Sequence, residues 1–211
     1  MHSEGPFHIE PLVDCVFIAL FGDPNRPNIL LEFLNAVVQP QVPIVGVVVQ
    51  NPRQGPAFIG DDLSVLDVEA IDSEGRTYQV EMQNRNHAGL RNRMLYDWAG
   101  LYEKQLQAGD SFQKLRPVIS IWVLNQNIMR YAPKVHHCFT TSDVDAKMTL
   151  SDHLQIHTIE LEKWREHSTG AGPALQRWLR FLTEAKEWRR VPEDLSSPGM
   201  EDAMGVLERF A

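Results

Sequence analysis

Apolar residues recur at helical spacing in two segments near the start of the chain, residues 11–21 and 27–38. The residues between them, 22–25, read Gly-Asp-Pro-Asn, a typical turn cluster. Residues 43–50 (PIVGVVVQ) are short and β-branched and lie between prolines, which predicts a strand, followed by a loop over 51–60. The chain therefore opens with two helices and a strand.

Residues 63–83 contain two runs of alternating apolar and polar residues, which predict a β-hairpin. The residues between the runs, Ser73-Glu74-Gly75, fit a three-residue loop in which Gly75 takes the left-handed conformation. This loop fixes the register, with an apolar face toward the core and a second face that gathers carboxylates and amides. The predicted pairs are Leu66 with Met82, Val68 with Val80, Ala70 with Tyr78, Asp67 with Glu81, Glu69 with Gln79, Val65 with Gln83, and Asp72 with Arg76.

The second half of the chain alternates helical and strand patterns. The predicted elements are a helix over 90–108 that is basic at its start, a strand over 117–124, weaker strands over 134–140 and 154–161, and an amphipathic helix over 173–190. We therefore expect an α/β fold with a mixed central β-sheet flanked by helices. A turn-rich stretch then predicts a domain over residues 1–190 and a C-terminal tail over 191–211 with a short helix.

Composition narrows the class of protein. The 211 residues are 43% hydrophobic and 23% charged, as in a globular protein with its own core. Two cysteines, no stretch approaching about 20 apolar residues and no signal-like N-terminus predict a cytoplasmic protein without a membrane segment. The formal net charge of -8 argues against a protein that coats DNA by neutralising phosphates.

The polar face of the hairpin is the main candidate for chemistry. Carboxylates directly opposite each other on antiparallel strands have Cβ atoms about 4.5–5.5 Å apart and repel. A divalent cation such as Mg²⁺ relieves that repulsion and can activate water, and Gln83 points to the same face as Glu81. The alternative is a solvated outer face of a surface hairpin, where such residues are common.

Asp67 in LSVLDVEA and Glu81-Met82-Gln83 in DSEGRTYQVEMQ resemble the catalytic core of the PD-(D/E)XK nuclease superfamily. The branch they resemble is that of recombination-promoting nucleases or putative transposases. Four further segments match that branch in the same order: residues 11–23, 30–38, 91–125 and 153–164. The resemblance implies a restriction-endonuclease-like core and a DNA endonuclease that depends on Mg²⁺ or Mn²⁺.

Carried over by position, the resemblance implies that Asp67 and Glu81 bind the metal. Gln83 then stands where the superfamily usually has lysine, as is common in this branch, and would orient water or substrate rather than supply a positive charge. Asp14 matches a further acidic position, with Glu32 as a competing candidate. Asp14 could equally serve to compensate the charge of a helix N-terminus.

Basic residues follow the second hairpin strand directly. Arg85, Arg91 and Arg93, with His87, could contact DNA phosphates beside the cut, or could simply form the solvated start of a helix. Residues 61–62, both aspartates, are expected in a solvated turn rather than on the metal.

Other chemistries have weaker support. The His-His-Cys run at 136–138 and the pair His153 and His157 suggest zinc, but in a strand the two histidines of the pair would lie too far apart to share an ion. Neither a Gly-x-Ser-x-Gly motif nor a glycine-rich phosphate loop occurs, so we expect no serine hydrolase and no nucleotide cofactor.

The predicted function is thus a metal-dependent DNA endonuclease of recombination or mobile elements. One alternative is a hydrolase that uses paired carboxylates on another substrate. Another is a catalytically inactive member of the family that binds DNA or protein, which the net charge of -8 favours. A C-terminal region rich in Trp and Leu also allows a homodimer.

Overall fold

A mixed β-sheet forms the centre of the computed structural model, which describes residues 8–50, 53–54, 66–167 and 170–211. The sheet has seven strands in the order β1-β3-β4-β5-β7-β6, with β2 pairing β3 off this path. β4 runs parallel to β5 and β5 to β7, whereas the other pairs are antiparallel. The strands are β1 (Val47–Val49), β2 (Arg53–Gln54), β3 (Leu66–Asp72), β4 (Thr77–Gln83), β5 (Val118–Leu124), β6 (His136–Ser142) and β7 (Thr149–Glu160).

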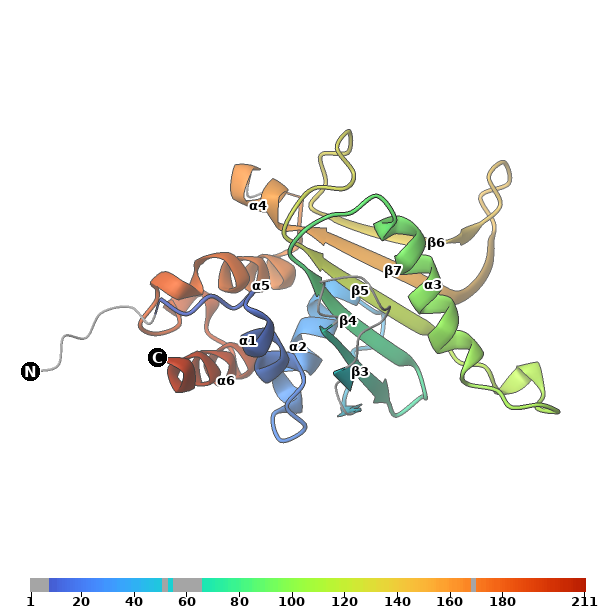
Figure 1. Cartoon of the computed structure of the whole chain (residues 1–211), viewed down its shortest axis with the longest axis horizontal. Coiled ribbons are helices and arrows are strands. Elements are labelled where there is room, and N and C mark those ends of the chain that lie inside the picture. The colour runs from blue at the N-terminus through green and yellow to red at the C-terminus, as the bar shows by residue number, and fades with distance from the viewer. Residues whose placement is uncertain (1–7, 51–52, 55–65, 168–169) are drawn as a thin grey trace, which may run out of the picture.

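Helices cover both faces of this sheet, so the predicted α/β fold is confirmed (Figure 1). One face carries most of the helices, while α3 lies alone across the other face, over the central strands. The helices are α1 (Asp14–Phe21), α2 (Pro27–Val38), α3 (Leu90–Glu103), α4 (Leu161–His167), α5 (Pro173–Glu184) and α6 (Pro198–Leu207). No helix in these described stretches is long and apolar enough to cross a bilayer.

The β3–β4 hairpin has the predicted register. Asp67 pairs Glu81, and Asp72 N donates to Arg76 O at 3.1 Å to close the loop. Gly75 has φ +79°, the left-handed conformation that the loop requires. Asp72 reinforces the turn, because its carboxylate accepts hydrogen bonds from the backbone N–H groups of Glu74 and Arg76. The predicted pairing of Val65 lies outside the described residues, as does the expected turn at 61–62.

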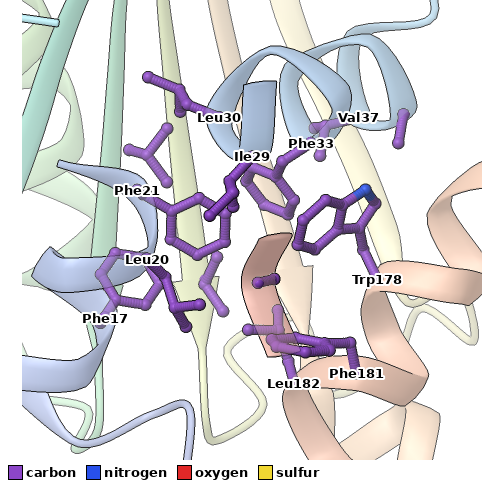
Figure 2. Close-up of a cluster of buried hydrophobic side chains, with 14 of the residues drawn as sticks. Phe17, Leu20, Phe21, Ile29, Leu30, Phe33, Val37, Trp178, Phe181 and Leu182 are labelled. Carbon is purple, nitrogen blue, oxygen red and sulfur yellow. The ribbon is translucent and has the colours of Figure 1, made fainter. Parts of the chain in front are cut away.

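The main hydrophobic core lies between the sheet and the helices α1, α2, α5 and α6. Aromatic rings from three of these helices meet there, with Phe33 of α2 edge-on to Trp178 of α5 at 5.5 Å between centroids (Figure 2). Phe21 of α1 packs against both rings. The last helix contributes to the same cluster with Met200, Ala203, Met204, Val206 and Leu207.

The chain departs from prediction at several element boundaries. The helix predicted over 173–190, for example, ends at Glu184, and the strand predicted over 43–50 covers only Val47–Val49. The helix predicted over 90–108 ends at Glu103, because the Gln105 side chain exchanges hydrogen bonds with the backbone of Arg116 and returns the chain to β5. β7 begins at Thr149, five residues before the predicted start, since its outer part is largely exposed and carries no apolar pattern. The last residue predicted for that strand, Leu161, instead begins α4, and β2 falls within a predicted loop.

Candidate functional site

Three polar side chains of the β3–β4 hairpin, on the face of the sheet that carries α3, are buried. Asp67, Glu81 and Gln83 are 8%, 1% and 5% exposed. α3 is held on this face of the sheet because its Leu90 and Met94 pack on apolar side chains of β5 and β7. The solvated surface face considered as an alternative is thus not what the structure has. Burying ionised side chains is costly unless they are paired.

Glu81 is the most deeply buried carboxyl of this face. Its Oε1 accepts a hydrogen bond from Arg93 Nη2 at 2.6 Å. Its Oε2 is buried and has no hydrogen-bond partner among the described residues. Burial raises the pKa of Glu81 to about 8, with Asp97 and Asp67 adding to the rise and Arg93 opposing it. Charge on Glu81 therefore depends on a nearby cation.

Asp97 of α3 joins this cluster, although nothing in the sequence singled it out. Arg93 Nε donates to Asp97 Oδ2 at 3.3 Å, one helical turn along α3. Burial raises the pKa of Asp97, and nearby Asp67 adds to the rise while Arg93 opposes it. Arg93 also lies over the ring of Trp122, 5.6 Å from its centroid. An acid four residues after an arginine was the available sequence signal, but such spacing usually marks an exposed helix pair.

Gln83 and Gln79 complete the polar face on β4. Gln83 Nε2 donates to the Arg85 backbone oxygen at 2.6 Å, which fixes the amide plane at the end of the strand. Gln79 Oε1 accepts from Ser120 Oγ, which in turn accepts from Trp122 Nε1, both at 2.8 Å. This chain of hydrogen bonds satisfies the buried polar atoms between β4 and β5 and holds the Trp122 ring on which Arg93 rests.

The two candidates for a further acidic residue lie in different places. Asp14 is in the first turn of α1, whose start is tied to the end of β4 by a 3.3 Å hydrogen bond from Asn84 Nδ2 to Leu12 O. Glu32 of α2 instead caps α6, because its carboxylate accepts hydrogen bonds from Ser197 Oγ at 2.6 Å and from the backbone N–H of Gly199 at 3.0 Å.

The three predicted DNA-contacting arginines are placed differently from one another. Arg93 is turned inward onto Glu81, whereas Arg85 and Arg91 are exposed where the chain passes from β4 to α3. Arg91 Nη2 donates to the backbone oxygen of Ile128, which joins the start of α3 to the loop after β5. A pocket of about 390 Å³ opens between these two segments. Its lining residues are Asn86, His87, Ala88, Leu90, Arg91, Asn127, Ile128 and Arg130, with no acid among them.

The histidines considered for zinc do not form one site. His153 Nδ1 contacts the hydroxyl of Tyr102 at 2.9 Å, whereas His157 contacts His136 at 2.9 Å and Cys138 Sγ at 3.6 Å. Within the described part of the chain, no group of three or more His, Cys, Asp or Glu residues is arranged to hold a metal ion.

A mixed sheet with helices on both faces, whose central hairpin sets two carboxylates opposite each other, has the core architecture of a PD-(D/E)XK nuclease. The family model described as PD-(D/E)XK nuclease family transposase matches residues 11–211. The chain belongs to this family, and the resemblance noted in its sequence is confirmed. No curated protein and no solved structure matches the chain.

Proposed function

We propose that this protein is a divalent-metal-dependent endonuclease that hydrolyses phosphodiester bonds of DNA in recombination or in the movement of mobile elements. The observation that carries the proposal is the pairing of Asp67 with Glu81 on a buried polar face of a family nuclease core. Nucleases of this superfamily generally use divalent metal ions.

The residues of this face fit a hard divalent cation. Such ions prefer carboxylate oxygens, and Glu81 presents a buried oxygen with no partner in the described part of the chain. Asp67 and Glu81 would hold the ion, Mg²⁺ or Mn²⁺. When bound, such an ion activates water and stabilises charge on a phosphoryl oxygen. Asp14, at the start of α1, is the proposed further acid.

Gln83 takes the position of the usual lysine and supplies no charge. Its side-chain amide is fixed by the hydrogen bond to Arg85 O. The neutral amide can therefore orient a neighbouring group but cannot neutralise its charge. We assign it to positioning water or a phosphate oxygen next to Glu81. The rate of cutting then depends on the metal and on other cations of the site.

DNA contact is assigned to the segment that leads from β4 into α3. Arg85 and Arg91 are exposed there, and the adjoining pocket is lined by Arg91, Arg130 and His87 without an acid. In a chain with a net charge of -8, such a local basic surface is suited to backbone phosphates. Arg93 was also expected to contact DNA, but its guanidinium is engaged by Glu81 and Asp97.

The proposal also includes a cytoplasmic location for the protein and its assembly into a homodimer. The two cysteines are free thiols, which fits the reducing cytoplasm. A homodimer would present two sites to the two strands of DNA. No nucleotide cofactor is part of the reaction.

Nicking of supercoiled plasmid tests the proposal. We expect the wild-type protein to nick in Mg²⁺ or Mn²⁺ and not in EDTA, and Asp67→Ala and Glu81→Ala to lose this activity. Glu74→Gln is the matched control, because Glu74 is in the turn of the same hairpin with a side chain that is 66% exposed. Nicking by both alanine variants at the wild-type rate would refute the assignment.

A catalytically inactive family member that binds DNA or protein is the second candidate. Two observations favour it: Gln83 stands where a catalytic cation is usual, and no three acids or histidines among the described residues are arranged to hold a metal ion together. Such a protein would retard DNA in a gel equally well in Mg²⁺ and in EDTA and would leave the plasmid supercoiled.

A further inference from the structure

Arg93 is the cation built into the carboxylate cluster of the hairpin. Its Nη2 lies 2.6 Å from Glu81 Oε1 and its Nε lies 3.3 Å from Asp97 Oδ2, and its side chain is only 18% exposed. The guanidinium plane is supported by the Trp122 ring at 5.6 Å. Three contacts therefore fix the conformation of a long side chain that would otherwise rotate about several bonds.

This arrangement uses only one of the two oxygens of Glu81. Oε1 is taken by Arg93, while Oε2 is buried without a partner among the described residues. A carboxylate that binds one group through each oxygen has its plane fixed, as is common for metal ligands whose second oxygen is held by a neighbouring side chain. Arg93 thus orients Glu81 and leaves Oε2 available.

The charges of the cluster agree with this interpretation. Asp67 and Glu81 face each other across the hairpin, and Arg93 joins Asp97 to Glu81 through two hydrogen bonds. In their ionised forms, three carboxylates and the one guanidinium of Arg93 leave two negative charges. One divalent cation neutralises that remainder with Arg93 still in place.

We propose that Arg93 is a positioning residue for metal binding: the chain Asp97–Arg93–Glu81, resting on Trp122, holds Glu81 so that Oε2 is available to a divalent cation. The inference rests on the proposed function. It gives Arg93 a role at the metal ligand in place of a contact with DNA, and it gives Asp97 a role that acts through Arg93.

Binding of Mn²⁺, followed by electron paramagnetic resonance of the free ion, tests the proposal without an activity assay. We expect Arg93→Met to weaken Mn²⁺ binding about 10- to 100-fold, the usual effect of losing a residue that orients a metal ligand. Arg93→Lys keeps the charge but not the planar fork and should weaken binding less. Asp97→Asn should lower the affinity a few-fold.

Two controls distinguish a positioning role of Arg93 from a general loss of structure. Arg180 is also held by two acids, Glu184 at 3.1 Å and Asp194 at 3.0 Å, so Arg180→Met is the matched variant and should leave the affinity unchanged. In a Glu81→Gln background, Arg93→Met should cause little further loss, since it acts through Glu81. Circular dichroism checks whether each variant is folded. If Arg93→Met is unfolded, the Mn²⁺ affinities of Arg93→Lys and Asp97→Asn test the positioning role instead.

The outcomes distinguish this inference from the proposed function. Wild-type affinity, or tighter binding, in the folded Arg93 and Asp97 variants would overturn the positioning role and leave the metal site intact. A wild-type protein that binds no Mn²⁺, or binds it equally well as Asp67→Ala, would overturn both.

Discussion

The turn between β3 and β4 determines whether Asp67 and Glu81 meet, and a single residue determines the turn. Gly75 has φ +79°, a backbone conformation that residues with a Cβ atom adopt only at a cost in free energy. The loop sets the register of both strands, and a slip by one residue would turn Glu81 to the opposite face. At this scale the sequence was sufficient, because the signal is local: alternation on both sides of a three-residue loop.

Gly75→Ala should destabilise the protein. We expect the free energy of unfolding to fall by about 1–2 kcal/mol in urea titrations, since the residue must hold a left-handed conformation. An added Cβ would also lie 3.3 Å from Cγ of Arg116. Gly46→Ala is the control, because an added Cβ there meets nothing within 4 Å. Equal stability of the two variants would contradict the role given to Gly75.

Replacing Glu32 should change the stability of the protein but not its affinity for metal. Glu32→Gln replaces the carboxylate at the N-terminus of α6 with a neutral amide, which should lower the free energy of unfolding by about 1 kcal/mol. Mn²⁺ affinity should stay at the wild-type value, because this carboxylate is engaged by α6. Denaturation and metal titration of the same samples check both, and a loss of affinity without a loss of stability would make Glu32 the further acid instead.

Strand and helix packing account for what sequence patterns did not predict. α3 brings Arg93 to Glu81 and Asp97 to Arg93, yet the sequence marked Arg93 only as a candidate DNA contact or as part of a solvated helix start. Only the long-range packing of α3 against β5 and β7 turns them inward. A pattern along one segment carries no such information, so the buried cation of the site became visible only in the structure.

The histidines of β6 and β7 should make stability depend on pH. Burial lowers the pKa of His136 to about 4, helped by His137 and Lys134, and burial and His136 lower that of His157 to about 3. Both are neutral in the folded state, while unfolded histidines bind a proton near pH 6.5. The contribution of these two histidines to stability is therefore full above about pH 6.5 and falls as the pH drops toward 4, by up to about 1.4 kcal/mol per unit for each histidine.

Replacing one member of this pair tests the prediction. His157→Gln should flatten the loss of stability between about pH 6.5 and pH 4, measured by urea unfolding at several pH values. His167→Gln is the control, since that side chain is 63% exposed. A variant as steep as the wild type would show that other groups cause the acid sensitivity.

The last helix of the chain, α6, is packed into the main core. The sequence predicts a tail over 191–211 beside a domain over 1–190, because a turn-rich stretch separates them. In the structure α6 packs against α1 and α2 and contributes to the main core. The turn-rich stretch does precede a separate helix, as predicted. The surface that this helix covers, however, depends on contacts between residues that are distant in sequence. The helix itself is short and apolar, so it is stable only when packed.

Deletion of residues 198–211 should therefore abolish cooperative folding. It removes Met200, Met204, Val206 and Leu207, each at most 3% exposed. Burying such side chains is worth about 1.5–3 kcal/mol each, comparable in sum to the total stability of a domain at about 5–15 kcal/mol. Deletion of 208–211 alone, which contains no buried residue, is the control. Circular dichroism and thermal unfolding decide, and a stable protein without α6 would favour a separable tail.

If the paired carboxylates of the hairpin make a metal-dependent nuclease, the rate of plasmid nicking must depend on the metal concentration. We expect a rate that saturates with Mg²⁺ or Mn²⁺, returns after EDTA when metal is added in excess, and falls by about 1,000-fold or more in Asp67→Asn. Nicking that persists in EDTA, or in Asp67→Asn at the wild-type rate, would show that the hairpin carboxylates do not hold a catalytic metal ion.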